Sequence, residues 1–360
     1  MRTFLVATLL TVGCHQTSAG TGLSGGGGST PLSSTGEGSS TTAASTSTSG
    51  SGTTTSASTG GDSSTSVALP QDMGSPDLPP GSVCNGKIDL VFVIDQGGAL
   101  DDFIGTLYDA YPEFLATIEE TFADVDLHVM FVDPNASWGA VPCPKGMCPE
   151  EGGCPADGYE DYPCWALYDE NALTKCDSTM GAGIIFPAGR LGINKPCVLP
   201  LGQRFITGDD PLFVERFSCL GRSGVSATSE PGWALGQALS LNLQVGCNAG
   251  FLRDDALLMP VIVTTRDFGP YNPYVWAQRV LEAKGFDQDM IVALGIADDS
   301  KARPDSECGA GNNAPNSGTF EWTQEFEHHV FGSICAPAYA PFFAEAAEMA
   351  ADLCANGPQN

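Results

Sequence analysis

The stretch Ile88-Asp89-Leu90-Val91-Phe92-Val93-Ile94-Asp95 decides the fold of this chain. Its apolar residues form a short, nearly continuous β-branched and aromatic run, which is typical of a central strand covered on both faces. A helical pattern follows, with apolar residues at three- and four-residue spacings between 103 and 118. The stretch therefore predicts a buried strand that ends at Asp95 and leads into a helix.

The alternation of strands and helices continues along the chain. Apolar runs predict strands at 125–132, 257–264 and 290–296. Periodic patterns predict helices at 231–243, 273–284 and 339–354. Because parallel strands need crossover connections, this order specifies an α/β fold with a doubly wound, mainly parallel sheet flanked by helices. Sites in such sheets lie at the carboxyl ends of the strands, where Asp95 and Asp267 both fall.

The amino terminus has the pattern of an export signal. Residues 1–13 begin with a positive charge and continue with an apolar run of about nine residues, far short of the roughly 20 needed to span a bilayer. The run ends at Thr11-Val12-Gly13-Cys14, which resembles a bacterial lipobox apart from Thr11, where leucine is usual. The resemblance implies a signal peptide cleaved before Cys14 and acylation of the Cys14 thiol. An ordinary secretory signal would instead leave Cys14 as an odd reactive thiol.

The residues after Cys14 predict a tether to a membrane. Acyl chains on Cys14 would anchor the protein at about 0.8 kcal/mol per buried methylene. His15 is not the aspartate that retains some lipoproteins at the inner membrane, so the outer membrane is the expected location. Residues 14–83 are mostly Ser, Thr, Gly and Ala, which predicts a disordered segment with an end-to-end distance of roughly 40 to 50 Å. One folded domain then occupies 84–360.

The charge of the chain excludes one class of partner. The sequence has 15 Lys and Arg residues against 43 Asp and Glu residues, a net charge of −28. Such a charge repels phosphate backbones and anionic lipid surfaces. We therefore expect no nucleic-acid partner, and no membrane contact other than the lipid anchor.

The cysteines indicate disulfides. Twelve of the thirteen remain once Cys14 is set aside, and an even number in an exported domain is typical of a disulfide framework. Half of them lie in a Gly- and Pro-rich insertion predicted at 133–200, which they are expected to staple: Cys143, Cys148, Cys154, Cys164, Cys176 and Cys197. Zinc is the alternative for this group, but the spacings lack the paired CxxC pattern and no histidine lies nearby. The others are Cys84, Cys219, Cys247, Cys308, Cys335 and Cys354.

Motifs of known catalytic chemistry are missing from the sequence. It has no HExxH, no GxSxG and no GxxxxGK[ST] motif. The adjacent pair His328-His329 is interpreted as part of a surface helix, and adjacent carboxylates, which point apart, as solvated charge. The protein is therefore predicted not to be an enzyme, and a hydrolase with an unrecognised site is the alternative.

Residues 88–95 resemble the opening of a von Willebrand factor type A (VWA) domain, whose first strand runs into an Asp-x-Ser-x-Ser metal loop. Two further segments, NAGFLRDDALL (248–258) and GSICAPAYAPF (332–342), are similar to segments of Gram-negative bacterial lipoproteins that carry this domain. The resemblance spans most of 84–360 apart from the insertion and implies the VWA fold. It implies little about the ligand, because those lipoproteins are mostly of unknown role.

The resemblance also implies a metal-ion-dependent adhesion site, which this sequence keeps only in degenerate form. In the family, a divalent ion is held by the Asp and two Ser of the first loop, a Thr of a second loop and an Asp after the fourth strand. Here the first loop reads DQGGA (95–99), without either serine, and Thr265 stands where the last Asp is expected. Because a hard cation needs about six oxygens, no cofactor is expected.

Other roles for these residues stay open. One alternative is a weak Mg²⁺ or Ca²⁺ site made by Asp95, Ser229 and Asp267, in a region where the second loop also offers Thr228. Arg266 could instead neutralise Asp95 or Asp267, and Asp95 could cap the following helix.

The resemblance suggests both a disulfide pairing and a role. Cys84 and Cys354 would join the domain ends, as in some relatives, and two further pairs suggested here are Cys219 with Cys247 and Cys308 with Cys335. The predicted function is a cell-envelope lipoprotein that displays a VWA-like adhesion module for a protein or cell-surface ligand. The alternative is a structural docking component of an envelope assembly.

Overall fold

The computed structural model describes 84–135, 173–200, 202–224, 229–265, 272–300, 306–308 and 317–356. The expectations for the signal peptide, for Cys14 and for the tether lie outside these residues. So do those for Thr228, Arg266 and Asp267, and for four cysteines of the predicted insertion: Cys143, Cys148, Cys154 and Cys164.

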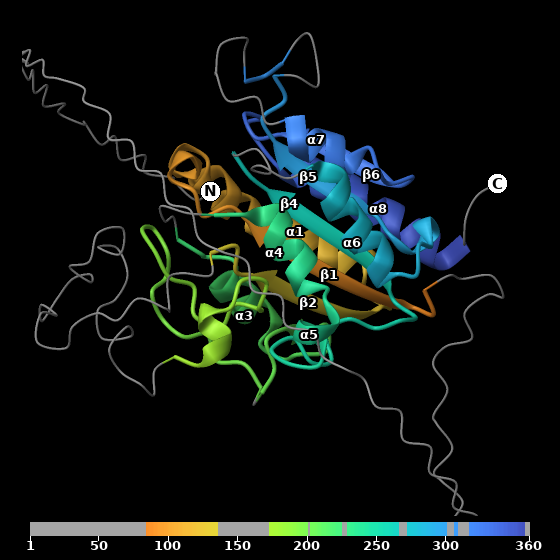
Figure 1. Cartoon of the computed structure of the whole chain (residues 1–360), viewed down its shortest axis with the longest axis horizontal. Coiled ribbons are helices and arrows are strands. Elements are labelled where there is room, and N and C mark those ends of the chain that lie inside the picture. Colours follow the sequence, from red (N-terminus) through yellow and green to blue (C-terminus); the bar gives the residue numbers. More distant parts are fainter. Residues whose placement is uncertain are drawn as a thin grey trace, which may run out of the picture. The chain divides into compact units, whose positions relative to one another are not determined.

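A six-stranded sheet forms the centre of the domain, in the order β3-β2-β1-β4-β5-β6 (Figure 1). The strands are β1 Lys87–Ile94, β2 Asp126–Val132, β3 Ile206–Thr207, β4 Leu257–Val263, β5 Ala293–Ala297 and β6 His329–Ser333. Neighbouring strands are parallel except for the short β3, which pairs antiparallel with β2. The predicted doubly wound, mainly parallel sheet is confirmed.

Helices cover both faces of this sheet. The α-helices are α1 Ile104–Thr121, α3 Phe213–Leu220, α4 Pro231–Ala238, α5 Leu241–Gln244, α6 Pro273–Ala283, α7 Ser317–Thr323 and α8 Ala340–Asn356. Short 3₁₀ helices are η1 Gly98–Asp102, η3 Lys175–Ser178 and η4 Gln288–Met290. Buried side chains of α1, α3 and α8 share one core cluster, and those of α4, α6 and α7 share the other.

The composition of β1 explains its central place. Successive side chains of a strand point to opposite faces, so a strand that is apolar at almost every position can fill two cores. Phe92 belongs to the core under α1 and α8, whereas Val91 and Val93 belong to the other core. The ring of Phe92 lies 4.8 Å from that of Phe131 and 5.9 Å from that of Phe343. Burial of each such side chain contributes about 1.5 to 3 kcal/mol.

Some expected elements differ from the structure. The helix predicted at 231–243 is two helices, because α4 ends at Ala238 and α5 begins at Leu241. The strand predicted from 290 begins at Ala293, after the turn of η4. His329 opens the edge strand β6, so the interpretation of the His328-His329 pair as part of a helix is wrong.

Four disulfides join described residues. Cys84 is bonded to Cys354 and Cys308 to Cys335, as suggested from the sequence. The suggested pair of Cys219 with Cys247 is wrong: Cys219 is bonded to Cys197, and Cys247 to Cys176. Two cysteines of the predicted insertion are therefore bonded to partners outside it. The reason is the fold, which brings Cys197 to Cys219 of α3 and Cys176 to Cys247, just after α5. The same segment also pairs with β2, since Ile184 N donates a hydrogen bond to Phe131 O.

Within the described part of the chain, no helix combines the length and the apolar character that crossing a bilayer requires.

Candidate functional site

The candidate site lies where the direction of winding changes. From β1 the chain proceeds outward to β2 and β3, and from β4 it proceeds the other way to β5 and β6. β1 and β4 are adjacent and end together, since Ile94 is in register with Val263. Ligands of doubly wound sheets bind outside the carboxyl ends of the strands at such a switch point. Residues that follow Ile94 and Val263 are therefore the first candidates for a site.

Asp95 occupies this switch point, and its carboxylate joins the ends of the two strands. The side chain is fully buried. Its Oδ1 accepts a hydrogen bond of 2.7 Å from Gly97 N. Its Oδ2 accepts hydrogen bonds from Thr264 Oγ1 at 3.0 Å, from Thr265 N at 3.2 Å and from Thr265 Oγ1 at 3.3 Å. The N-cap residue of η1 is Gly97, so the alternative in which Asp95 caps the following helix is wrong. Asp95 instead accepts the hydrogen bond from Gly97 N, directly before η1.

Ser229 brings a third segment to this place. Its Oγ accepts a hydrogen bond of 3.0 Å from Gln96 N, which sets the residue just before α4 beside the loop after β1. Two of the three candidate ligands, Asp95 and Ser229, are thus on neighbouring segments. The sequence analysis missed Thr264 as a partner of Asp95. Its place directly after β4, beside the end of β1, was the available signal.

The described residues do not form the oxygen set of a tightly held divalent ion. Mg²⁺ and Ca²⁺ take six or more oxygen ligands, with carboxylates dominant. Around Asp95 the described donors are one carboxylate, which already accepts four hydrogen bonds, and the hydroxyls of Ser229, Thr264 and Thr265. None of the described Lys or Arg side chains forms an ion pair with Asp95.

Two buried polar atoms near this edge have no hydrogen-bond partner among the described residues. One is Oε1 of Gln96, whose side chain is 3% exposed, and the other is Oγ of Ser223, which is 1% exposed. A buried polar group without a partner costs about 1 to 3 kcal/mol. Gln96 directly follows Asp95 in the chain, so this unpaired acceptor belongs to the segment that leaves β1.

Carboxylates continue along the same edge of the sheet. Asp133 follows β2 and accepts a hydrogen bond of 2.8 Å from Asn135 N, and Asp298 follows β5 and accepts one of 2.8 Å from Ser300 N. Each repeats the bond that Asp95 makes to a backbone N–H two residues ahead. These side chains shape the turns that leave the strands, and they give the carboxyl edge a negative character.

Asp299 holds the loop after β5. It accepts hydrogen bonds from Ser306 Oγ at 2.6 Å, Glu307 N at 3.1 Å and Cys308 N at 3.2 Å. Burial by itself would raise the pKa of Asp299, but these hydrogen bonds outweigh it and hold the pKa below its usual value. The disulfide from Cys308 to Cys335 fixes the same loop to the end of β6.

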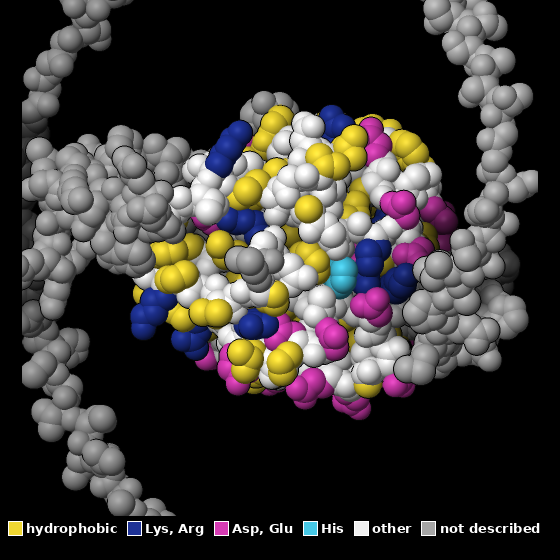
Figure 2. Space-filling model, turned by 90° about the horizontal axis from the view of Figure 1, so that it is seen from below, with side chains coloured by type: hydrophobic (Ala, Val, Ile, Leu, Met, Phe, Trp, Pro, Cys, Tyr) yellow, Lys and Arg dark blue, Asp and Glu magenta, His cyan; other side chains and the backbone are white. Residues whose placement is uncertain are grey.

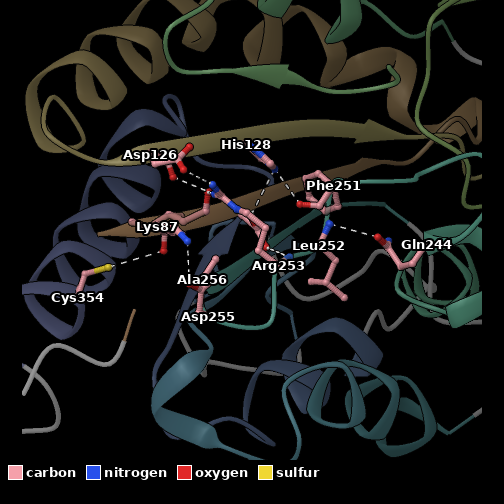
Figure 3. A network of polar contacts seen from close by, with 12 residues as sticks. Lys87, Asp126, His128, Gln244, Phe251, Leu252, Arg253, Asp255, Ala256 and Cys354 are labelled. Atoms are coloured by element: carbon pink, nitrogen blue, oxygen red, sulfur yellow. Dashed lines mark hydrogen bonds and ion pairs between the residues drawn. The ribbon is translucent and has the colours of Figure 1, made fainter. Parts of the chain in front are cut away.

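The opposite, amino edge carries a second buried carboxylate, Asp89 of β1. Arg253 donates to it from its backbone N at 2.7 Å and from Nε at 2.8 Å, and Lys284 Nζ lies 3.9 Å from Oδ2. Arg253 also binds the carboxylate of Asp126, and His128 binds the carbonyl oxygen of Phe251 (Figure 3). Burial raises the pKa of Asp89, against the opposing effect of Arg253 and Lys284. Burial likewise lowers the pKa of Lys284.

Asp289, Glu327 and His328 form a further polar cluster at this edge, with possible ligand atoms within 4.8 Å of one another. His328 Nε2 lies 3.2 Å from Asp289 Oδ1, so a hydrogen bond explains why these two side chains meet.

Comparison with known proteins gives only distant likenesses. No family model matches the chain, and no curated protein matches it. Among solved structures, a von Willebrand factor type A protein from Catenulispora acidiphila is similar over 73% of this chain and 42% of its own, with 13% identity and a TM-score of 0.38. Proximal thread matrix protein 1 from the mussel byssus is similar over 75% and 46%, with 13% identity and a TM-score of 0.33. The chain spans less than half the length of each, and these scores are too low to assign it to either family.

Proposed function

We propose that the chain is an exported, lipid-anchored binding protein of the bacterial envelope whose VWA-like domain contacts a protein or cell-surface ligand at its carboxyl edge. The observation that carries this proposal is the position of Asp95. A fully buried carboxylate stands at the switch point of a doubly wound sheet, held by neutral donors.

The surroundings of Asp95 support a binding role for this edge. Directly beyond it, Gly98 and Ala99 are exposed, and the space around Gly98 is open. Gln96, the residue that follows Asp95, has a buried side-chain acceptor with no partner among the described residues. Among the described residues, Thr264 and Thr265 join the loop after β4 to the loop after β1 through hydrogen bonds to the Asp95 carboxylate, and a ligand donor could compete for that carboxylate.

We further propose that binding does not depend on a tightly held Mg²⁺ or Ca²⁺ ion and that the domain is not a catalyst. The donor set around Asp95 supports the first statement. For the second, the hydroxyls of Thr264 and Thr265 donate to the Asp95 carboxylate, and that carboxylate accepts no hydrogen bond from a histidine, cysteine or lysine among the described residues.

A blocking substitution tests the binding edge. Ala99→Arg adds a long side chain at an exposed position of the loop that follows Asp95, and Ala116→Arg makes the same change at an exposed site in the middle of α1. The processed full chain and both variants would be used to capture binding partners from envelope extracts of the native host. We expect one or more partners to be lost with Ala99→Arg and retained with Ala116→Arg. Identical capture by all three proteins would refute the carboxyl edge as the ligand surface.

Lipid anchoring has a separate test. Cys14→Ser should abolish incorporation of radiolabelled palmitate and release the protein from the membrane fraction. Labelling that persists in the Cys14→Ser variant would contradict the assignment of Cys14.

A further inference from the structure

A groove lies at the amino end of β2, away from the carboxyl edge. It is formed by the last turn of α1, by the residues that lead into β2 and by the segment between β3 and α3. Its volume is about 610 Å³, enough for several side chains of a partner. Val125 and Leu127 line it at the start of β2, whereas the proposed ligand edge begins beyond Val132, at the other end of the same strand.

The apolar residues that line the groove are called its floor here, and they are in part exposed. Ile118 and Phe122 lie on the α1 side, and Phe213 and Val214 lie on the α3 side. Val214 is 44% exposed, and the neighbouring Leu212 is 45% exposed. On the face shown in Figure 2, exposed apolar side chains lie among acidic and basic ones. Exposed apolar side chains that adjoin a groove are typical of an interaction surface.

The rim of the groove is acidic. Glu119, Asp209, Asp210 and Glu215 line it, and the described lining contains no Lys or Arg. Arg216, just outside the lining, forms an ion pair with Asp210. Among the described residues, Glu119, Asp209 and Glu215 form no ion pair. The negative charge of the rim is therefore largely uncompensated.

We propose that this groove docks a basic, amphipathic segment of a partner protein. The apolar floor would bury the hydrophobic side chains of that segment, while the three carboxylates would pair with its Lys or Arg residues. Charge argues against the other occupants. A second copy of this chain carries −28, residues 15–83 contain no Lys or Arg, and an anionic membrane surface would be repelled.

A designed peptide tests the proposal on the full chain. The probe is a fluorescent Leu/Lys peptide of about four helical turns with one apolar face, and a second peptide carries Glu in place of Lys. Binding would be measured by fluorescence anisotropy near physiological ionic strength, where long-range attraction is screened. We expect the basic peptide to bind and the acidic peptide not to bind. Failure of the basic peptide to bind would overturn the proposal.

Matched variants separate this groove from the general charge of the protein. Glu119→Gln with Glu215→Gln removes two rim carboxylates, and Glu345→Gln with Glu348→Gln removes two exposed carboxylates from α8. The first pair should weaken binding about fivefold, and the second pair less than about twofold. Equal losses would show that the peptide senses only net charge and would refute the groove.

A third comparison tests the apolar floor. Val214→Ser should weaken the peptide about threefold, whereas Val275→Ser, at a valine of α6 that is 42% exposed, should leave binding unchanged. No loss with Val214→Ser would contradict an amphipathic occupant. Ala99→Arg should not affect this peptide, so the groove and the carboxyl edge can fail independently.

Discussion

A buried carboxylate lies at each end of β1, and the two carboxylates have different kinds of partner. Asp89, near the amino end, and Asp95, directly after the carboxyl end, are both fully buried. Arg253 binds Asp89 directly, and Lys284 lies nearby. Asp95 is held by backbone N–H groups and threonine hydroxyls.

This difference bears on the binding role proposed for the carboxyl edge. At the amino end the charge is neutralised by the chain's own cations, which also tie the segment before β4 to β1 and β2. At the carboxyl end the described residues supply hydrogen bonds but no positive charge. We therefore propose a ligand contact at the carboxyl edge and a structural role for Asp89.

The largest expected effect is that of Asp89→Asn, which leaves Arg253 and Lys284 buried without their anionic partner. We expect the free energy of unfolding to fall by about 3 kcal/mol. Chemical denaturation at neutral pH measures it. Asp255→Asn, which breaks the exposed ion pair with Lys87 at the same edge, is the control and should cost less than about 1 kcal/mol. If the two variants lost equal stability, the buried cluster would not hold this edge together.

Asp95→Asn should cost less, about 1 to 2 kcal/mol, because its partners are neutral and leave no buried cation behind. The same denaturation series measures it, with Asp102→Asn, at an exposed position of η1, as the control. A loss as large as that of Asp89→Asn would erase the distinction between the two edges.

Asp299→Asn sharpens the comparison through pH. Because the pKa of Asp299 in the folded state lies below the ordinary value of an aspartate, its ionised form contributes stability that is present above about pH 4. That contribution is lost as the pH falls through the lowered pKa. Wild type should therefore exceed the variant by about 1 kcal/mol at pH 7, and the gap should close at the acid end. A gap independent of pH would contradict this role.

The smallest expected effect is that of divalent ions. If any site at Asp95 has a dissociation constant above about 10 mM, then about 1 mM Mg²⁺ or Ca²⁺ stabilises by less than 0.1 kcal/mol. Differential scanning fluorimetry with added ions or with EDTA should then show a shift in Tm of less than about 1 °C. A rise of several degrees that Asp95→Asn abolishes would establish a metal site instead.

Some features of the domain were predictable from local patterns. Continuous apolar runs identified β1, β2 and β4, because a strand buried on both faces needs no polar positions. The alternation with helices then required a parallel sheet and placed Asp95 at its carboxyl edge. Two short strands were not predicted. β3 has only two residues, and β6 contains His329 and Gly332, so neither shows a clear hydrophobic period.

The sequence by itself determined that β1 is a buried strand ending in an aspartate, because periodicity depends only on neighbours in the chain. Tertiary structure alone decided which carboxylate meets a cation. Arg253 reaches Asp89 across 164 positions, and Thr264 reaches Asp95 across 169. The same holds for Cys176 and Cys197, which pair with Cys247 and Cys219 because the folded chain brings those segments together. Contacts between distant residues depend on how helices and strands pack, and spacing along the chain does not encode that packing.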